Sequence, residues 1–369
     1  MKKIGFLLLL TLPLRGQNVL LREPARDVAY HLPEVYELVN VAFALTDQGR
    51  ADRNMVEHNS DYHRRVMARF GASGQHPFVR FLNRKLSKGY GYYLYSRYAY
   101  VLDFTPGGRL RYTDRLTGQP RLMARLLGSS ARRGLLRRFA RETQFRAFFN
   151  ENRFFYEKTL AQVQARCPVA DIQNWLEKQF PARYDSYALV VSPLVGGTHS
   201  TTRFGRSCVM WVSDAAGYDT TRYTEAQIRG LYTGVVFTEI DHNYVNPVSG
   251  QHRAALDAAL NRREFWAASD GDTRNYGSPY AVFNEYMTHA TYLLYERERL
   301  NPADFEVVKT SRVRLMTQRR KFVRFAEFYE AIAGLYDRRT ANQTLTDLYP
   351  AILDWCRDVQ SDPSVVARP

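Results

Sequence analysis

Apolar residues recur at helical intervals over much of the chain. In segment 34–45 they lie three to four positions apart and share one face: Val35, Leu38, Val41, Ala42 and Leu45. Segments 78–86 and 145–163 follow the same period. The pattern therefore predicts that helices dominate the first half of the chain.

Two short apolar runs break this pattern near the middle of the chain. Residues 187–191 and 207–212 are typical of strands, and the Gly196-Gly197 pair between them indicates a turn. A small sheet among helices predicts a mainly helical α+β fold. Because the pattern changes there, we expect a helical part over 17–180 and a second part over 181–369.

The first sixteen residues have the layout of a signal peptide. Met1-Lys2-Lys3 is positively charged, residues 4–14 are mostly apolar, and Gly16 is a small residue before a cleavage point. The apolar run is too short for a membrane-spanning helix, which needs about 20 residues, and no later run is longer. We expect a mature chain, 17–369, that is secreted or periplasmic and has no transmembrane segment.

The chain is strongly basic, and the expected export of the protein changes which anionic partners this charge indicates. The 52 Lys and Arg residues exceed the 37 Asp and Glu residues, which gives a net charge of +15. Outside the cytoplasm this charge favours anionic cell-surface polymers over nucleic acid as partners. Residues 109–141 hold ten Arg and one acid, Asp114, with leucines interleaved at helical spacing. We interpret this segment as amphipathic helices with a solvated basic face, and binding to an anionic polymer is the alternative.

Cysteines are too few to organise the fold. Three occur in the whole chain, which excludes a disulfide framework and a four-thiolate zinc site. Cys208 lies in a predicted strand and is expected to be inert. Cys167 and Cys356 could form a disulfide, and the sequence leaves their pairing open.

The residues with the clearest chemical meaning lie on one long predicted helix. Thr224-Glu225-Ala226-Gln227 is a capping box, and the apolar period after it predicts a helix that ends at Asn246-Pro247. Residues 238–242 read Thr-Glu-Ile-Asp-His, one substitution from His-Glu-x-x-His. In that motif two histidines on one helix face hold Zn²⁺, and the glutamate is the general base for the bound water. Glu239 and His242 are therefore candidates for base and ligand, and a threonine replaces the first histidine.

A second predicted helix, 281–299, carries further candidates. Glu285 is placed to supply a third zinc ligand, and His289 follows one turn later. Each residue also has an ordinary structural explanation. Glu239 and His242 would then be a buried, hydrogen-bonded pair, Glu285 would pair with an arginine, and His289 would be a surface or packing residue.

Several short motifs follow one another in a distinctive order: Tyr36-Glu37-Leu38 with Ala44-Leu45-Thr46-Asp47, Tyr62-His63, His76-Pro77, Ser192 to Gly197, Thr238 to Pro247, and Asn284-Glu285-Tyr286. In these motifs the chain resembles a family of secreted bacterial proteins, classed as a domain of unknown function, that carries a gluzincin-type metallopeptidase signature. In that family, segment 238–247 reads like His-Glu-x-x-His-x-Tyr-Val-Asn-Pro. The resemblance spans most of the mature chain. It implies a zincin-like fold with a small antiparallel sheet beside the motif helix, Glu239 as base, and His242 and Glu285 as zinc ligands.

Three functions remain open at this point. In the first, the protein is a degenerate metallopeptidase. Thr238 removes one of three ligands, so zinc binding is weak or absent and hydrolysis of peptide or protein substrates is reduced or lost. A histidine restored at this position should then restore zinc. We prefer this hypothesis.

In the second hypothesis the enzyme is active with a rearranged ligand set. Gluzincins often have an acid four residues after the third-ligand glutamate, where it orients the first histidine. This chain has His289 there, and its imidazole could replace the missing ligand. In the third hypothesis the chain is a non-enzymatic secreted protein that binds anionic cell-surface polymers.

Overall fold

The computed structural model describes most of the chain, over residues 18–23, 27–88, 91–113, 115, 130–270, 273–274 and 276–362. The expected signal peptide, 1–16, lies outside the described residues. So do Asp114 and residues 116–129 of the arginine-rich segment. The remaining elements are mostly helices with small sheets, which agrees with the predicted α+β class.

The chain forms two compact units, and each is described by itself. The first consists mainly of residues 31–160, and the second mainly of 161–189 and the residues from 199 onward. Residues 161–180, which the sequence pattern grouped with the N-terminal part, belong to the second unit.

The first unit is built around α1 (Glu34–Ala44), whose residues are all buried. The predicted helix at 34–45 is therefore confirmed. Helices and a strand from the same unit contact it: α2 (Asp47–Ala51), α3 (Asp61–Phe70), α4 (Pro77–Leu86), α5 (Gly91–Tyr100), β3 (Leu102–Phe104) and α8 (Phe145–Glu151). β4 (Leu110–Tyr112) pairs with β3 in an antiparallel hairpin.

The helix predicted over 145–163 is divided in the structure. α8 ends at Glu151, and α9 (Arg153–Arg166) begins two residues later. The side chain of Asn152 donates a hydrogen bond of 2.8 Å to the Phe148 carbonyl. A short polar side chain that competes for a backbone carbonyl in this way weakens a helix locally. The spacing of apolar residues does not reveal this break.

The described part of the arginine-rich segment forms α7 (Ser130–Glu142). Leu136 and Phe139 are buried, whereas Arg137, Arg138 and Arg141 are exposed. The predicted amphipathic character is therefore confirmed over this helix, and its apolar face packs into the first unit.

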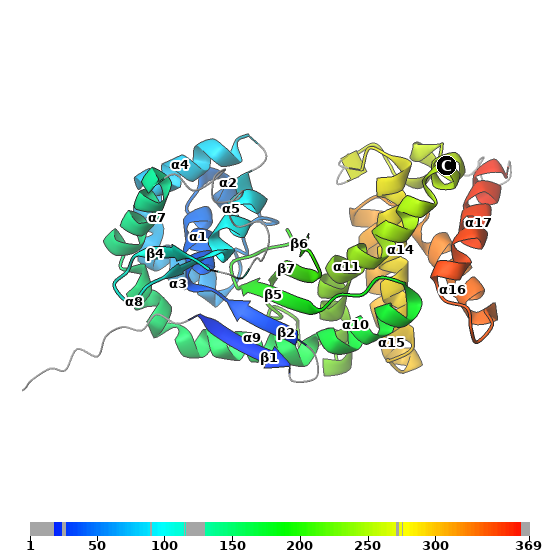
Figure 1. Ribbon diagram of the computed structural model, residues 1–369, viewed down its shortest axis with the longest axis horizontal. Helices are drawn as coiled ribbons and strands as arrows, with labels where there is room; N and C mark the ends of the chain where they lie inside the picture. Colours follow the sequence, from blue (N-terminus) through cyan, green and yellow to red (C-terminus); the bar gives the residue numbers. More distant parts are fainter. Residues whose placement is uncertain are drawn as a thin grey trace, which may run out of the picture. The chain divides into compact units, whose positions relative to one another are not determined.

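A five-stranded sheet has the order β1-β2-β5-β7-β6. Its strands are β1 (Val19–Glu23), β2 (Asp27–Leu32), β5 (Ser186–Ser192), β6 (Ser200–Phe204) and β7 (Ser207–Ser213). β5 and β7 match the two predicted strands and lie side by side (Figure 1). The pattern of apolar residues did not predict β1, β2 or β6. β6 and β7 form an antiparallel hairpin that turns at Gly205, whose φ of +59° suits a glycine.

Helices from the second unit pack beside this hairpin. α11 (Glu225–Gln251) contacts β6 and β7, and it also packs along α14 (Pro279–Arg297) and against α15 (Pro302–Arg314). The other helices of the unit are α10 (Val169–Gln179), α12 (Arg253–Ala259), α13 (Arg263–Trp266), α16 (Phe325–Arg338) and α17 (Tyr349–Ser361). None of the helices among the described residues is long and apolar enough to cross a bilayer.

The prediction that the motif helix ends at Asn246-Pro247 is wrong. α11 begins at the predicted capping box but continues through Pro247 to Gln251. Proline has no N–H, so the Asn243 carbonyl one turn earlier loses its usual helical partner. The hydroxyl of Tyr184 donates a hydrogen bond of 2.8 Å to that carbonyl. A tertiary contact thus satisfies the group that the proline leaves unpaired, and the helix continues.

The cysteines do not pair. Cys167, Cys208 and Cys356 are all free and buried. Burial raises the pKa of each thiol, which keeps all three protonated and inert at neutral pH.

Two glycines on α11 allow its neighbours to approach closely. A Cβ at Gly234 would lie 1.9 Å from Nη2 of Arg312 and 2.7 Å from Cζ of Tyr292. A Cβ at Gly230 would lie 2.9 Å from Cγ2 of Val308. Because real Cβ atoms do not approach so closely, any larger residue forces these side chains, or the helices α14 and α15 that carry them, to shift.

We therefore expect Gly234→Ala to destabilise the protein by about 1–3 kcal/mol, the usual cost of overpacking. Gly250→Ala is the matched control. Gly250 lies on the same helix, and a Cβ there would meet nothing within 4 Å. That change should be neutral or stabilise by up to about 1 kcal/mol, because alanine is the better helix former. Urea unfolding of both variants measures the difference, and equal effects would contradict this description of the interface.

Candidate functional site

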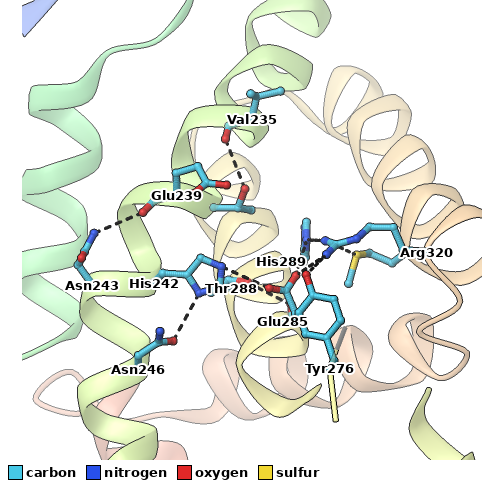
Figure 2. Close-up of polar contacts among 12 residues, drawn as sticks. Val235, Glu239, His242, Asn243, Asn246, Tyr276, Glu285, Thr288, His289 and Arg320 are labelled. Atoms are coloured by element: carbon cyan, nitrogen blue, oxygen red, sulfur yellow. Dashed lines mark hydrogen bonds and ion pairs between the residues drawn. The ribbon is translucent and has the colours of Figure 1, made fainter. Parts of the chain in front are cut away.

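The packing of α11 on α14 brings four of the sequence-predicted side chains together. Glu239 and His242 come from α11, and Glu285 and His289 come from α14 (Figure 2). Nε2 of His242 lies 3.4 Å from Oε1 of Glu285, and Nε2 of His289 lies 3.6 Å from Oε2 of Glu285. The Glu285 carboxylate is therefore placed between two imidazoles.

An arginine that sequence analysis did not single out completes this cluster. Arg320 directly follows a π-helical turn at Leu315–Arg319. Its Nη2 lies 2.8 Å from Oε2 of Glu285 and 2.6 Å from the Tyr276 hydroxyl. Its Nη1 lies 2.6 Å from Nε2 of His289. One guanidinium thus contacts a carboxylate, an imidazole and a phenol (Figure 2).

A second arginine reaches His289 from the other side of the ring. Nη1 of Arg312 lies 2.9 Å from Nδ1 of His289, and the guanidinium stacks 4.4 Å from the Tyr292 ring centre. Gly234 leaves the space through which this side chain passes. A neutral imidazole has one acceptor nitrogen, so only one of the two arginines can donate a hydrogen bond to it.

Burial lowers the pKa of His289 to about 3, and the charges of Arg312 and Arg320 act in the same direction. The nearby Glu285 carboxylate opposes this shift but does not overcome it. His289 is therefore neutral at physiological pH, and both of its nitrogens face a cation.

Glu285 and His242 form an ion pair. Burial alone would raise the pKa of Glu285, but Arg320, His242 and His289 outweigh it and hold that pKa well below its usual range. Burial alone would lower the pKa of His242, but the hydrogen bond and charge of Glu285 raise it to about 9. The side chain of His242 is 23% exposed and that of Glu285 is 8% exposed, so the histidine lies on the solvent side of the pair.

Glu239 has a different environment from Glu285. Burial raises its pKa to about 7, although the charge of His242 opposes the shift. Among the described residues no side chain forms a hydrogen bond with its carboxylate. A partly buried carboxyl group with a pKa near neutrality has the titration behaviour of a general acid or base.

Two neighbours on α11 are buried without a role in the ion pairs. Thr238 donates a hydrogen bond of 3.0 Å to the Gly234 carbonyl of its own helix. Asp241 is fully buried, and neither of its carboxylate oxygens has a hydrogen-bond partner among the described residues. Burial raises its pKa well above the usual range, so Asp241 is a neutral acid.

These residues do not fit a zinc ion in their present arrangement. Zinc needs deprotonated ligands with open lone pairs. His242 pairs with Glu285, Glu285 is also bound by Arg320, His289 faces two guanidiniums, and the hydroxyl of Thr238 is used within its helix. In the part of the chain that the structure describes, no group of three or more His, Cys, Asp or Glu side chains is arranged to hold a metal ion.

Comparisons with family models, curated proteins and solved structures find no match to this chain.

The ion pairs of Glu285 predict a large cost for removing its charge. In Glu285→Gln, Arg320 and His242 lose their shared anion in a largely buried site, so we expect a loss of about 3–5 kcal/mol. Glu296→Gln is the matched control on α14. Burial raises the pKa of Glu296 to about 7, so at pH 6 the change replaces one mostly neutral group by another.

Urea unfolding at pH 6 compares the two variants. Glu296→Gln should lose much less stability than Glu285→Gln. Similar losses in both would show that the anion of Glu285 contributes nothing beyond the burial of a carboxyl group.

The raised pKa of His242 predicts a specific dependence of stability on pH. Because the folded-state pKa is about 9 and the ordinary value is 6.5, the pair stabilises fully below pH 6.5. This contribution is lost as the pH rises through 9. The difference in unfolding free energy between wild type and His242→Gln should therefore shrink from pH 6 to pH 10.

The same substitution in a Glu285→Gln background supplies the control for this pH dependence. Without the Glu285 carboxylate, the effect of His242→Gln on the unfolding free energy should stay nearly constant from pH 6 to pH 10. If this effect is also constant with Glu285 present, Glu285 does not hold the His242 proton.

Proposed function

We propose that this protein is a zincin-like metallopeptidase-fold protein that has lost metal-dependent hydrolysis and binds extended polypeptide. The observation that carries the proposal is the contact of Arg320 with both Glu285 and His289. A cationic side chain holds Glu285, the carboxylate that a peptidase of this class would use for zinc, and Thr238 stands where a ligand histidine is required. A secreted or periplasmic location is part of the proposal and depends on the expected signal peptide.

The position of β6 supports the binding of a peptide. β6 is the last strand of the sheet, and β7 is its neighbour in that sheet. Nδ2 of Asn243 lies 3.3 Å from Oγ1 of Thr201 on β6 and 3.3 Å from the Glu239 carbonyl. An extended chain that paired with this strand would therefore run past the α11 residues of the site. Strand addition supplies affinity through backbone hydrogen bonds and needs no metal.

The rearranged enzyme with His289 as ligand is less well supported. Its imidazole would have to bind a cation while Arg312 and Arg320 both face its nitrogens. Both arginines would first have to leave. Binding to an anionic cell-surface polymer stays as the second candidate, since Arg137, Arg138 and Arg141 form an exposed basic face on α7.

Zinc content, hydrolysis and peptide binding together test the proposal. Wild type and His289→Ala, incubated with zinc and desalted, should contain far less than one zinc per chain and should not cleave denatured casein. Wild type should retain members of a pooled library of ten-residue peptides. A library methylated on alternate backbone nitrogens should bind at least about tenfold less, because it lacks donors for strand pairing.

Other outcomes would contradict the proposal. Stoichiometric zinc that disappears in His289→Ala would favour the rearranged enzyme. Retention of a polyanion such as heparin, with no retention of any peptide, would favour the polymer-binding candidate.

A further inference from the structure

We propose that Arg320 is a built-in cation that closes a latent divalent-metal site between α11 and α14. The inference rests on the proposed function, since it treats these two helices as ligand-bearing helices whose metal has been replaced. It goes further by naming the group that replaced the metal and the substitutions that reopen the site.

The guanidinium contacts the carboxylate that a metal would use and, beside it, the imidazole of His289. Its Nη2 contacts Oε2 of Glu285 at 2.8 Å, and its Nη1 contacts Nε2 of His289 at 2.6 Å. The Tyr276 hydroxyl fixes the guanidinium from a third direction at 2.6 Å. A planar group with several donors can satisfy a carboxylate and a second acceptor at once. In this arrangement the guanidinium of Arg320 lies at Oε2 of Glu285, where an ion would otherwise bind.

The positive charges around Glu285 and His289 also oppose the binding of a metal ion. Arg312 and Arg320 place two guanidinium charges beside His289, and Arg320 also contacts Glu285. A divalent ion would add two more positive charges to this largely buried site, where repulsion is poorly screened. Replacing Arg320 by a neutral residue removes one of these charges and frees the Glu285 carboxylate.

Arg320 and Thr238 therefore obstruct the same site in two independent ways. Thr238 withholds an imidazole, whereas Arg320 occupies the carboxylate. Sequence analysis alone predicts that Thr238→His restores zinc. With Arg320 in place we expect a different result. Thr238→His alone should raise zinc affinity little, because Arg320 still contacts Glu285. Thr238→His combined with Arg320→Met should raise it strongly, because two imidazoles and one carboxylate are then open to the ion.

The test measures zinc and cobalt binding to the full chain in these variants. The double variant should bind one zinc per chain at least about 100-fold more tightly than Thr238→His alone. Its cobalt form should show the intense visible absorption of a four-coordinate ion. Arg320→Met alone should bind weakly, because His242 and Glu285 supply two ligands and Arg312 still contacts His289.

Two control variants in the Thr238→His background separate charge from general loosening. Arg320→Lys keeps the cation and should not gain zinc. Arg324→Met removes a nearby arginine that pairs with Glu327 rather than Glu285, and it should not gain zinc either. If Arg320→Met prevents folding, as judged by circular dichroism, Arg320→Gln with Thr238→His takes its place because the amide retains hydrogen bonding.

Zinc bound by Thr238→His alone as tightly as by the double variant would overturn the inference. A folded double variant that takes up no metal would overturn it as well. Either result leaves the proposed function intact if wild type remains without zinc and retains peptides. Stoichiometric zinc and hydrolysis in wild type would instead overturn the proposed function.

Discussion

The buried carboxylate of Glu285 is the group on which the rest of the site depends. An ionised carboxylate loses its water on burial and must regain that stabilisation from the protein. Arg320 and His242 supply it directly, and their contacts set the charge states of the neighbouring groups. His242 holds its proton because of Glu285, and His289 stays neutral because two guanidiniums face it.

The packing of the helices places these cations where the carboxylate needs them. Gly234 leaves room for Arg312 to pass α11 and reach His289, and Gly230 lets α15 approach α11. The π-helical turn at Leu315–Arg319 follows α15 and places Arg320 within reach of Glu285 and Tyr276. Backbone features some distance from the motif therefore decide whether the carboxylate pairs with a side chain.

Much of the helical architecture follows from local patterns in the sequence. The capping box starts α11 where predicted, and the strands β5 and β7 lie where short apolar runs predict them. Glu285 and His289 were found on the second helix because four-residue spacing places them on one face. β6 was missed because Ser200, Thr201 and Thr202 form a polar run without an apolar alternation.

The parts that could not be predicted depend on contacts between residues far apart in the sequence. α11 continues past Pro247 because Tyr184, 59 positions before Asn243, satisfies a carbonyl that the proline leaves open. Arg320 lies among several arginines that follow α15, and nothing in its local pattern distinguishes it from Arg319 or Arg324. Its contacts with Glu285 and His289 arise only when the helices pack.

The central claim is that Glu285 is neutralised by a side chain in place of a metal ion. The most direct measurement is anomalous diffraction at the zinc absorption edge from crystals of the wild-type protein grown with zinc. The account predicts no anomalous peak at Glu285 and continuous density for the Arg320 guanidinium against its carboxylate. A strong peak within about 2.2 Å of Glu285 and of an imidazole nitrogen, with Arg320 displaced, would contradict it.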